Sequence, residues 1–390
     1  MKFPSMAEPD GRTLGDEEVA AAERVIRSGM LNSVWGTEAR ALEREIARLY
    51  GTRHAITCSS GTAALHLSVV AAAPDPGDEI ITTPITDFGT VAPILAQNAV
   101  PVFADVDPRD GNLDPGSVAA LIGPRTKAIM AVHLFGAPAR VAELRALADE
   151  HGLTLIEDCA QAWLTELPGG RLAGTAGQVG CLSLQQWKHI TCGDGGVAIT
   201  DDDELAGRMR LFSDKGWDRA SGRSHAAFAL NYRMTELQAA VARAQLAKLP
   251  GVVAARRRTA AQLIDALKGL ARLRLPRQDG HAWWLFPIVC QDGDAPELAA
   301  HLAKAGIPAR AGYLAEPLNR APVWDAAVYG TSRYPLDGYR PNPCPQAERM
   351  VDRTLLVIDW NENYTAAHVE LIAAEITVLY QGLTRPRRAH

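Results

Sequence analysis

Short apolar segments alternate with amphipathic ones from about residue 38, and this alternation limits the possible folds more than any other feature. Residues 38–51, "EARALEREIARLYG", have helical periodicity, and "HAITC" (54–58) reads as a short strand. Further runs rich in Val, Ile and Leu follow, some separated by amphipathic stretches such as 138–152: "DEIITTP" (78–84), "VPVFADVD" (100–107), "TKAIMAVHLFG" (126–136) and "LTLIEDCA" (153–160). The alternation indicates βαβ units, and such apolar strands fit an α/β fold with a mostly parallel sheet between helices.

The pattern changes after two more strand-like runs, "CLSL" (181–184) and "GVAIT" (196–200). Residues 233–270 predict a long helix with one Pro-Gly interruption, which suits a bridge between domains. A chain of 390 residues, 47% of them hydrophobic, can bury a large core and is expected to divide in two. We predict an N-terminal arm and large domain over residues 1–250, and a smaller C-terminal α+β domain over residues 251–390.

Composition and charge argue against several classes of protein. A net charge of −5 gives no electrostatic footprint for nucleic acid, and we interpret the basic segment "TRPRRAH" (384–390) as a solvated tail. No apolar run reaches the roughly 18 residues needed to span a bilayer, and the N-terminus lacks the apolar stretch of a signal peptide, so we expect a cytoplasmic protein. The six cysteines show no metal-ligand spacing, which favours reduced packing residues and no metal site.

Two strand ends carry residues suited to binding. In "TCSSGTAALHL" (57–67) a strand ends at Cys58, and Gly61 and Thr62 open an apolar helix whose first N–H groups are free. That geometry suits a phosphate, although an ordinary helix cap explains the same residues. Asp158 lies at the carboxyl end of a very apolar strand, where ligands bind in open α/β sheets. Its carboxylate could pair with a protonated ring nitrogen, or serve as a cap or a structural ion pair.

A third stretch, "SLQQWKHITCGDGG" (183–196), places Lys188 between a strand and a glycine cluster. The glycines leave room for close backbone approach, and a lysine held there could form a Schiff base with an aldehyde cofactor. Taken singly, Lys188 is better explained as a surface lysine, since most lysines are exposed. The interpretation therefore rests on the three stretches together.

Together, these stretches resemble the DegT/DnrJ family of pyridoxal-phosphate-dependent sugar aminotransferases, which have the type I aminotransferase fold. The motifs "SSGTAAL", "EDCAQA", "QQWKHITCGDGG" and "NYRM" occur in the family's order and spacing. The resemblance runs from about residue 29 to residue 240 and more loosely beyond. It implies that Lys188 forms the Schiff base with pyridoxal 5'-phosphate, that Asp158 pairs with the pyridinium nitrogen, and that Gln161 lies near the phenolic oxygen.

The resemblance also implies the remaining cofactor contacts and an oligomeric state. Phe88 falls where the family places an aromatic ring stacked on the cofactor. The phosphate would be held by Gly61, Thr62 and Ser183, and by Asn231 reaching across from a second subunit. An active site completed in this way implies a homodimer.

The implied activity is transfer of an amino group from glutamine or glutamate to a keto-sugar or an aminocyclitol ketone, in specialised (natural product) biosynthesis. Two departures put a nucleotide-sugar acceptor in doubt: Trp187 replaces a smaller residue, and residues 306–324 lack the family's His-Tyr pattern. The pair Gln185-Gln186 resembles members that aminate cyclitol ketones. Two alternatives stay open, a different reaction on the same cofactor (dehydration, decarboxylation or oxidative chemistry) and a non-catalytic regulator or scaffold.

Several other side chains admit both a packing role and a functional one. For His189 we favour a structural role over contact with phosphate or substrate, and for His66 simple packing. We expect Trp163, Trp187, Trp283 and Trp284 to lie in the core, with a pocket position as the alternative for Trp187. Trp187 is close enough to Lys188 in sequence to shape a pocket.

Overall fold

The computed structural model describes residues 1–383 except 220, 223, 328 and 329, so the basic segment 384–390 lies outside the described residues. The helices are α1 (Asp16–Ser28), α2 (Glu38–Tyr50), α3 (Gly61–Ala72), α4 (Ala92–Ala96), α5 (Pro115–Ala119), α6 (Val141–His151), α7 (Asp203–Ser213), α8 (Glu236–Leu267), α9 (Ala295–Lys304), α10 (Pro345–Arg349) and α11 (Ala366–Leu383). The strands are β1 (His54–Cys58), β2 (Glu79–Thr82), β3 (Val100–Phe103), β4 (Thr126–Val132), β5 (Thr154–Asp158), β6 (Val179–Ser183), β7 (Gly196–Thr200), β8 (Trp217–Asp218), β9 (Ser224–His225), β10 (Leu273–Arg274), β11 (Leu285–Cys290), β12 (Ala309–Ala311) and β13 (Leu355–Asp359).

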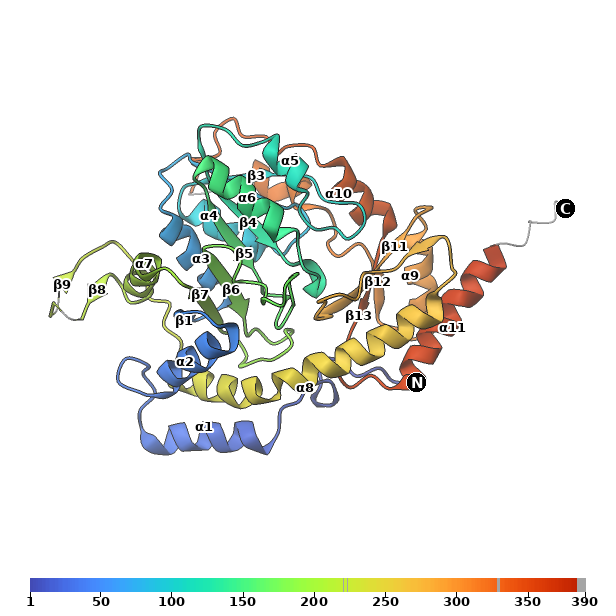
Figure 1. Ribbon diagram of the computed structural model, residues 1–390, viewed down its shortest axis with the longest axis horizontal. Helices are drawn as coiled ribbons and strands as arrows, with labels where there is room; N and C mark the ends of the chain where they lie inside the picture. Colours follow the sequence, from blue (N-terminus) through green and yellow to red (C-terminus); the bar gives the residue numbers. More distant parts are fainter. Residues whose placement is uncertain (220, 223, 328–329, 384–390) are drawn as a thin grey trace.

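The larger sheet has seven strands in the order β1-β7-β6-β5-β4-β2-β3 (Figure 1). β7 runs antiparallel to both of its neighbours, whereas the other neighbouring pairs are parallel. Each strand predicted between residues 54 and 200 is present, and the mostly parallel sheet is confirmed. Because β1, β2, β4, β5 and β6 all run in one direction, the segments that follow them gather at one edge of the sheet.

Helices cover both faces of this sheet because successive strand residues point to opposite sides. Ile129 and Leu155 belong to a core shared with α2, α6 and α8. Their neighbours Met130 and Ile156 belong to a second core, shared with α3 and α7. The strands are apolar on both faces, so the sheet has to be buried between two helical layers.

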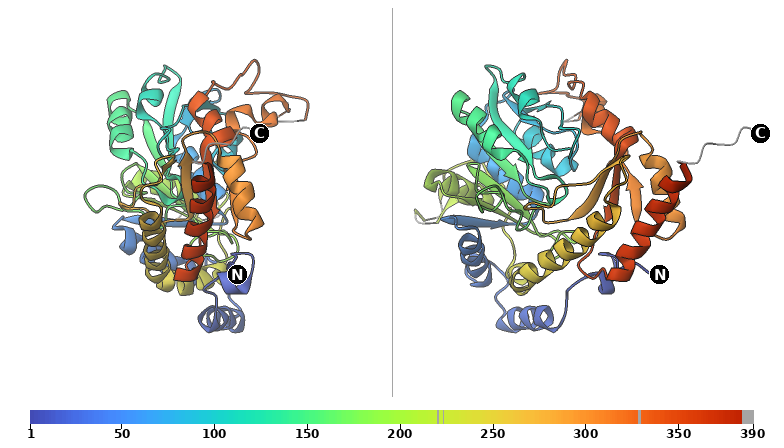
Figure 2. Two further views of the ribbon diagram at one scale, coloured as in Figure 1. Left: turned by 90° about the vertical axis from the view of Figure 1, so that its right-hand side faces the viewer. Right: turned by 45° about the vertical axis from the view of Figure 1, so that its right-hand side comes forward.

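A four-stranded antiparallel sheet, in the order β10-β11-β13-β12, forms the smaller C-terminal part of the fold. Its core includes side chains from α9 and α11 and from the end of α8, as well as Phe3 from the N-terminal segment. α8 crosses the lower part of the molecule in Figure 1, above α1, and packs against α1, α2 and α11 (Figures 1 and 2). The predicted smaller α+β unit is therefore confirmed, and α8 connects it to the larger sheet.

The predicted interruption of this long helix is wrong, because α8 continues through Pro250. A proline inside a helix removes one backbone hydrogen bond and usually kinks or breaks the helix. In α8 the neighbouring side chains Leu249, Val252 and Val253 are buried on both sides of the proline, so packing holds the helix together. The proposed domain boundary at residue 250 falls inside this continuous helix and stays a prediction.

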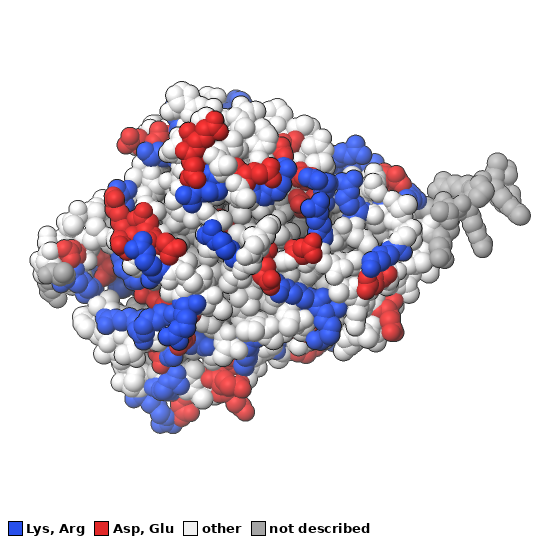
Figure 3. Space-filling view, viewed as in Figure 1, with Lys and Arg blue, Asp and Glu red and all other residues white. Residues whose placement is uncertain are grey.

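The cysteines and the charged side chains are placed as the sequence led us to expect (Figure 3). All six cysteines are free. Basic and acidic side chains are interspersed over the face shown in Figure 3. Among the helices of the described ranges, none is long and apolar enough to cross a membrane.

A buried carboxylate, Glu157, fastens the loop between β5 and β6. Its Oε1 accepts hydrogen bonds from the N–H groups of Ala176 (2.7 Å) and Gly177 (2.6 Å). Its Oε2 accepts from the N–H of Gly174 (2.9 Å) and pairs with His133 Nε2 (2.9 Å). Burial raises the pKa of Glu157, but the hydrogen bonds and charge of its partners outweigh burial, so the net pKa is lowered.

We predict that Glu157→Gln lowers the free energy of unfolding at pH 7 by about 3 kcal/mol, because an amide NH₂ would face backbone N–H donors with no partner. Since the folded pKa of Glu157 is below the ordinary carboxyl value of about 4.3, the wild-type advantage is complete above that pH. It should disappear as the pH falls through the folded pKa. Urea unfolding between pH 3 and 7 measures both effects.

The matched control is Glu143→Gln, an exposed change on α6 that should shift stability by less than about 0.5 kcal/mol. A difference between wild type and Glu157→Gln that grows as the pH is lowered would contradict the expected direction of the pH dependence.

Candidate active site

A cavity of about 440 Å³ opens at the edge of the large sheet where β1, β5 and β6 end. It lies against the smaller sheet, since residues at the start of β11, in β12 and at the end of β13 also line its wall. Six of the predicted site residues, which are far apart in the sequence, converge on the wall of this cavity: Gly61, Thr62, Asp158, Gln161, Ser183 and Lys188.

Lys188 lies in a turn that follows β6, with its N–H donating to Gln185 O (2.9 Å). Its Nζ lies 4.2 Å from the centre of the Trp284 ring, a cation–π distance. Burial lowers the pKa of the Lys188 amine, and the charges of Asp158 and Asp87 partly oppose this shift. A lowered pKa makes the neutral, nucleophilic form of the amine easier to reach near neutral pH.

Asp158 is the last residue of β5 and is buried. Its Oδ1 accepts from the N–H of Ala160 (3.0 Å), and its Oδ2 accepts from the hydroxyl of Thr90 (2.8 Å). Burial raises its pKa, and these two hydrogen bonds and the charge of Lys188 only partly offset that effect. A buried carboxylate whose hydrogen-bond donors are both uncharged would be stabilised by a cationic ligand group.

The start of α3 forms another part of the cavity wall. Ser60 caps the helix by accepting from Ala63 N (3.0 Å), and the N–H groups of the first two helical residues, Gly61 and Thr62, have no partner within the helix. A Cβ built on Gly61 would lie 2.8 Å from the Cβ of Ser183, so only glycine fits there. The helix N-terminus and the Ser183 hydroxyl are therefore brought together as an anion cradle.

The remaining wall combines Gln161, which was predicted, with Tyr313 and Arg310, which the sequence did not single out. Gln161 Oε1 accepts from the N–H of Phe135 (2.7 Å), and its Nε2 donates to the hydroxyl of Tyr313 (3.3 Å). Arg310 of β12 forms an ion pair with Asp359 at the end of β13, and about two-fifths of each side chain is exposed.

Phe88 and Asn231 do not line this cavity within the described part of the chain. The ring of Phe88 lies 6.4 Å from that of Trp324, in the apolar cluster beside β11 and β13. Asn231 is exposed and follows the β8–β9 hairpin, which projects from the body of the molecule in Figure 1. Their predicted cofactor contacts stay predictions.

The expectations for the histidines agree with the observed packing. His189 is fully buried, and its Nε2 contacts Ala282 O (2.9 Å). His66 bonds to Tyr232 and Gln97, and burial lowers its pKa to about 4.

The tryptophans divide between core and cavity. Trp163 and Trp283 lie in the core as predicted. The core position expected for Trp187 is wrong, because this side chain is 40% exposed and lines the cavity. The expectation for Trp284 is incomplete, because this side chain is buried and also forms the cavity wall beside Lys188. It was missed because its sequence context is that of a buried strand.

For the other cavity residues, the sequence pattern gave little or no indication of a binding role. Thr86, Asp87 and Thr90 are polar residues just after a buried strand, which is a pattern that indicates a binding edge. Tyr313 and Arg310 follow no motif that spacing alone could have identified.

One buried group has metal-ligand atoms, namely His133, Glu157 and Cys159. The ring nitrogens of His133 are both engaged, with Glu157 and with the N–H of Ala139 (3.1 Å). Each Glu157 oxygen also has two partners, as described above. We therefore interpret the cluster as a structural hydrogen-bond network that holds the loop between β5 and β6.

Comparison with known proteins first defines a class. The structure matches that of an aminotransferase from Psychrobacter cryohalolentis with a TM-score of 0.86 and 30% sequence identity, covering 95% of this chain and 98% of the other. The chain is 36% identical over 368 residues to L-glutamine:2-deoxy-scyllo-inosose aminotransferase of Streptomyces kanamyceticus, which is 88% of this chain and 83% of the relative. It is 35% identical over 335 residues to UDP-N-acetyl-3-dehydro-alpha-D-glucosamine 3-aminotransferase of Acidithiobacillus ferrooxidans, 83% of each. The protein is an aminotransferase.

The family follows from the sequence profile that matches residues 12–377, that of the DegT/DnrJ/EryC1/StrS aminotransferase family. The chain belongs to this family, and the resemblance drawn from its motifs is confirmed.

We predict that Asp158→Asn lowers the pKa of the Lys188 amine further, because the Asp158 carboxylate favours the protonated amine. The rate of Lys188 acetylation by acetic anhydride, followed against pH by peptide mass spectrometry in cofactor-free protein, reports this pKa. In the wild type the midpoint should lie below 10.5, and in the variant it should lie lower still.

Asp149→Asn, an exposed change on α6 far from the cavity, serves as the control and should leave the midpoint where it is. A higher midpoint in Asp158→Asn than in the wild type would show that the two groups do not interact as described.

Proposed function

We propose that the protein is a pyridoxal-5'-phosphate-dependent aminotransferase that moves an amino group from glutamine or glutamate to a keto-sugar or an aminocyclitol ketone. The observation that carries this proposal is the placement of Lys188 and Asp158 in one buried cavity, at the sheet edge where α/β enzymes bind ligands. An aldehyde-bearing, protonated ring is the kind of ligand that such an amine and such a carboxylate would bind together.

The residues present fit this cofactor. Asp158 lacks a charged hydrogen-bond partner, and a pyridinium N–H would provide one. The cradle of Gly61, Thr62 and Ser183 offers N–H and hydroxyl donors to a phosphate. The side-chain amide of Gln161 would lie at the phenolic oxygen, with Phe88 contributing to the ring's surroundings.

When bound, pyridoxal 5'-phosphate supplies the electron sink that makes the Cα–H bond of an amino donor breakable. Asp158 would help to hold the ring nitrogen in its protonated form by placing a negative charge against it. Burial lowers the pKa of the Lys188 amine, which makes its neutral form easier to reach, and this amine would carry the proton removed from the donor's Cα, first as general base and then as general acid. Trp284 limits the positions open to this amine.

The wall formed by the smaller sheet suits the two substrates of such a cycle. Arg310 and Lys188 are the basic residues that line the cavity in the described ranges. Arg310 offers a guanidinium to the donor's carboxylate, and its exposed pairing with Asp359 is weak enough to exchange. The two relatives, one named for a glutamine donor and a cyclitol ketone and the other for a nucleotide-linked keto-sugar, support this substrate range. A role in natural product biosynthesis is part of the same proposal.

We further propose a homodimer in which Asn231 contacts the phosphate bound by the other subunit. Its exposure, and its position beyond the projecting β8–β9 hairpin, support a contact made outside its own subunit.

Lys188→Ala should bind the cofactor only noncovalently and should lose transamination by at least about 10³-fold, because the variant lacks both the covalent link and the proton carrier. The test is borohydride reduction with peptide mapping, together with the spectral change from the aldehyde to the amine form when glutamine or glutamate is added. The amine form should then return to the aldehyde form when keto-sugars or cyclitol ketones are supplied.

Lys127→Ala, an exposed change at the start of β4, is the matched control and should keep both behaviours. Arg310→Gln should keep the covalent link but need a higher donor concentration. If the wild type carries no reduced adduct at Lys188, or if an amino donor alone gives no amine form, the proposed function is wrong.

Mixing Lys188→Ala with Asn231→Ala subunits should restore activity, because one site of each hybrid dimer then has both residues intact. Activity should approach one quarter of the wild-type level if subunits exchange at random and each hybrid contributes one intact site. Native mass spectrometry verifies that exchange has occurred, and verified hybrids without recovered activity would mean that the site is not shared.

A further inference from the structure

Behind the Lys188 turn lies a buried arginine whose bonding is unusual. Arg12, in the segment between the N-terminus and α1, is only 6% exposed. Its Nη1 donates to Lys188 O at 3.0 Å, while its Nε and Nη2 have no hydrogen-bond partner among the described residues. Burial lowers the pKa of this guanidinium. A buried cation with a single bond is costly, and such a group in a native structure calls for a reason.

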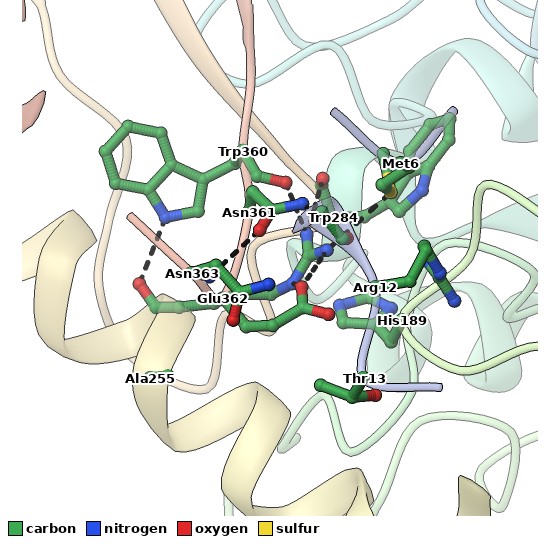
Figure 4. A network of polar contacts seen from close by, with 12 residues as sticks. Met6, Arg12, Thr13, His189, Ala255, Trp284, Trp360, Asn361, Glu362 and Asn363 are labelled. Carbon is green, nitrogen blue, oxygen red and sulfur yellow. Dashed lines mark hydrogen bonds and ion pairs between the residues drawn. The ribbon is translucent and has the colours of Figure 1, made fainter. Parts of the chain in front are cut away.

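The backbone on either side of Arg12 is fastened to the rest of the molecule. Asn361 Nδ2 donates to Gly11 O (2.9 Å), and Lys248 Nζ of α8 donates to Thr13 O (2.7 Å). Figure 4 shows Arg12 and Thr13 beside the segment of Asn361 and Asn363. Since both flanking carbonyls are held, the root of the Arg12 side chain has a fixed position.

The segment that holds Gly11 is itself fixed by a second arginine, Arg256 of α8, which is fully buried. Its Nη1 donates to the carbonyls of Trp283 (3.0 Å), Trp284 (3.0 Å) and Trp360 (2.8 Å), and its Nη2 pairs with Glu362 Oε2 (2.7 Å). One guanidinium thus ties α8 to the residues before β11 and after β13. The segment of Arg12 is therefore attached, through Asn361, to the residues after β13 that Arg256 holds.

The residues on either side of Lys188 are hydrogen-bonded to the segment before β11. Trp284 Nε1 donates to Trp187 O (2.7 Å), and His189 Nε2 contacts Ala282 O (2.9 Å). Lys188 O accepts no bond other than that from Arg12 within the described ranges. The preceding peptide is held separately, since the Lys188 N–H donates to Gln185 O. The orientation of the peptide that joins Lys188 to His189 therefore depends on the bond from Arg12 to its carbonyl.

We propose that Arg12 is a positioning residue that orients the Lys188 backbone so that its amine points at the reaction centre. This inference rests on the proposed function, in which that amine carries the proton. Loss of the Arg12 bond frees the peptide to rotate and displaces the side chain that follows from it. A displacement of about 1 Å at a reacting group can cost about 10²-fold in rate.

The experiment compares Arg12→Gln and Arg12→Lys with Arg27→Gln, an exposed arginine of α1 paired with Glu23. Arg12→Gln should lower the rate constant for amine-form generation at saturating donor by about tenfold or more, with KM within about twofold. Arg12→Lys keeps one donor and should recover part of the rate. Arg27→Gln should match the wild type. The visible circular dichroism of the bound cofactor should change in Arg12→Gln, because the lysine link is reoriented, and should match the wild type in Arg27→Gln.

A second readout needs no cofactor. Hydrogen exchange of the cofactor-free protein, measured on peptides that cover residues 185–190, should be faster in Arg12→Gln and unchanged in Arg27→Gln. Unchanged exchange in this turn, a rate constant within twofold of the wild type, or an effect confined to KM would each overturn the proposal. If Arg12→Gln gives no cooperative unfolding transition, Arg12→Met, which keeps the length of the side chain and removes every donor, replaces it under the same criteria.

Failure of the proposed function looks different. In that case the wild type itself would carry no reducible adduct at Lys188, while the exchange measurement would still report whether Arg12 holds the turn.

Discussion

The structure depends on holding an amine and a carboxylate side by side in one buried cavity, where burial disfavours the charged form of each. Lys188 and Asp158 face one cavity, and burial pushes the pKa of the amine down and that of the carboxylate up. Each group would be cheaper to hold at the surface. Rigid surroundings are needed to keep both in place, and the two sheets, each with its own apolar core, supply those surroundings.

Buried arginine and glutamate side chains join the parts of this scaffold. Arg256 donates to three carbonyls and to one oxygen of Glu362 where α8 passes the smaller sheet, and Glu157 of β5 bonds to three backbone N–H groups and to His133. A buried charge with complete hydrogen bonding specifies one geometry strongly, because any other arrangement leaves donors or acceptors unpaired. Such groups explain how segments far apart in the chain can set positions in the cavity to within the tolerance that catalysis needs.

The two substrates of an amino-transfer cycle place conflicting demands on one cavity. A donor amino acid carries a carboxylate, whereas a keto-sugar or cyclitol ketone presents mainly hydroxyl groups. In the proposed function, the half-exposed pair of Arg310 and Asp359 would meet both demands, since the guanidinium could bind a carboxylate and return to Asp359 when none is present. The wall contributed by the smaller sheet is thus where substrate choice is expected to reside, and the larger sheet is where cofactor chemistry is expected to reside.

The sequence alone determined the sheet, its helical cover, the smaller α+β unit, and the residues at the ends of β1, β5 and β6, because apolar periodicity and strand ends are local properties of the chain. It did not indicate that α8 continues through Pro250, that Trp284 and Tyr313 form the cavity wall, or that Arg12 reaches Lys188 across 176 positions. Those outcomes come from packing between distant segments. A local pattern states which side of an element is apolar, but only the folded chain decides which side chain meets which.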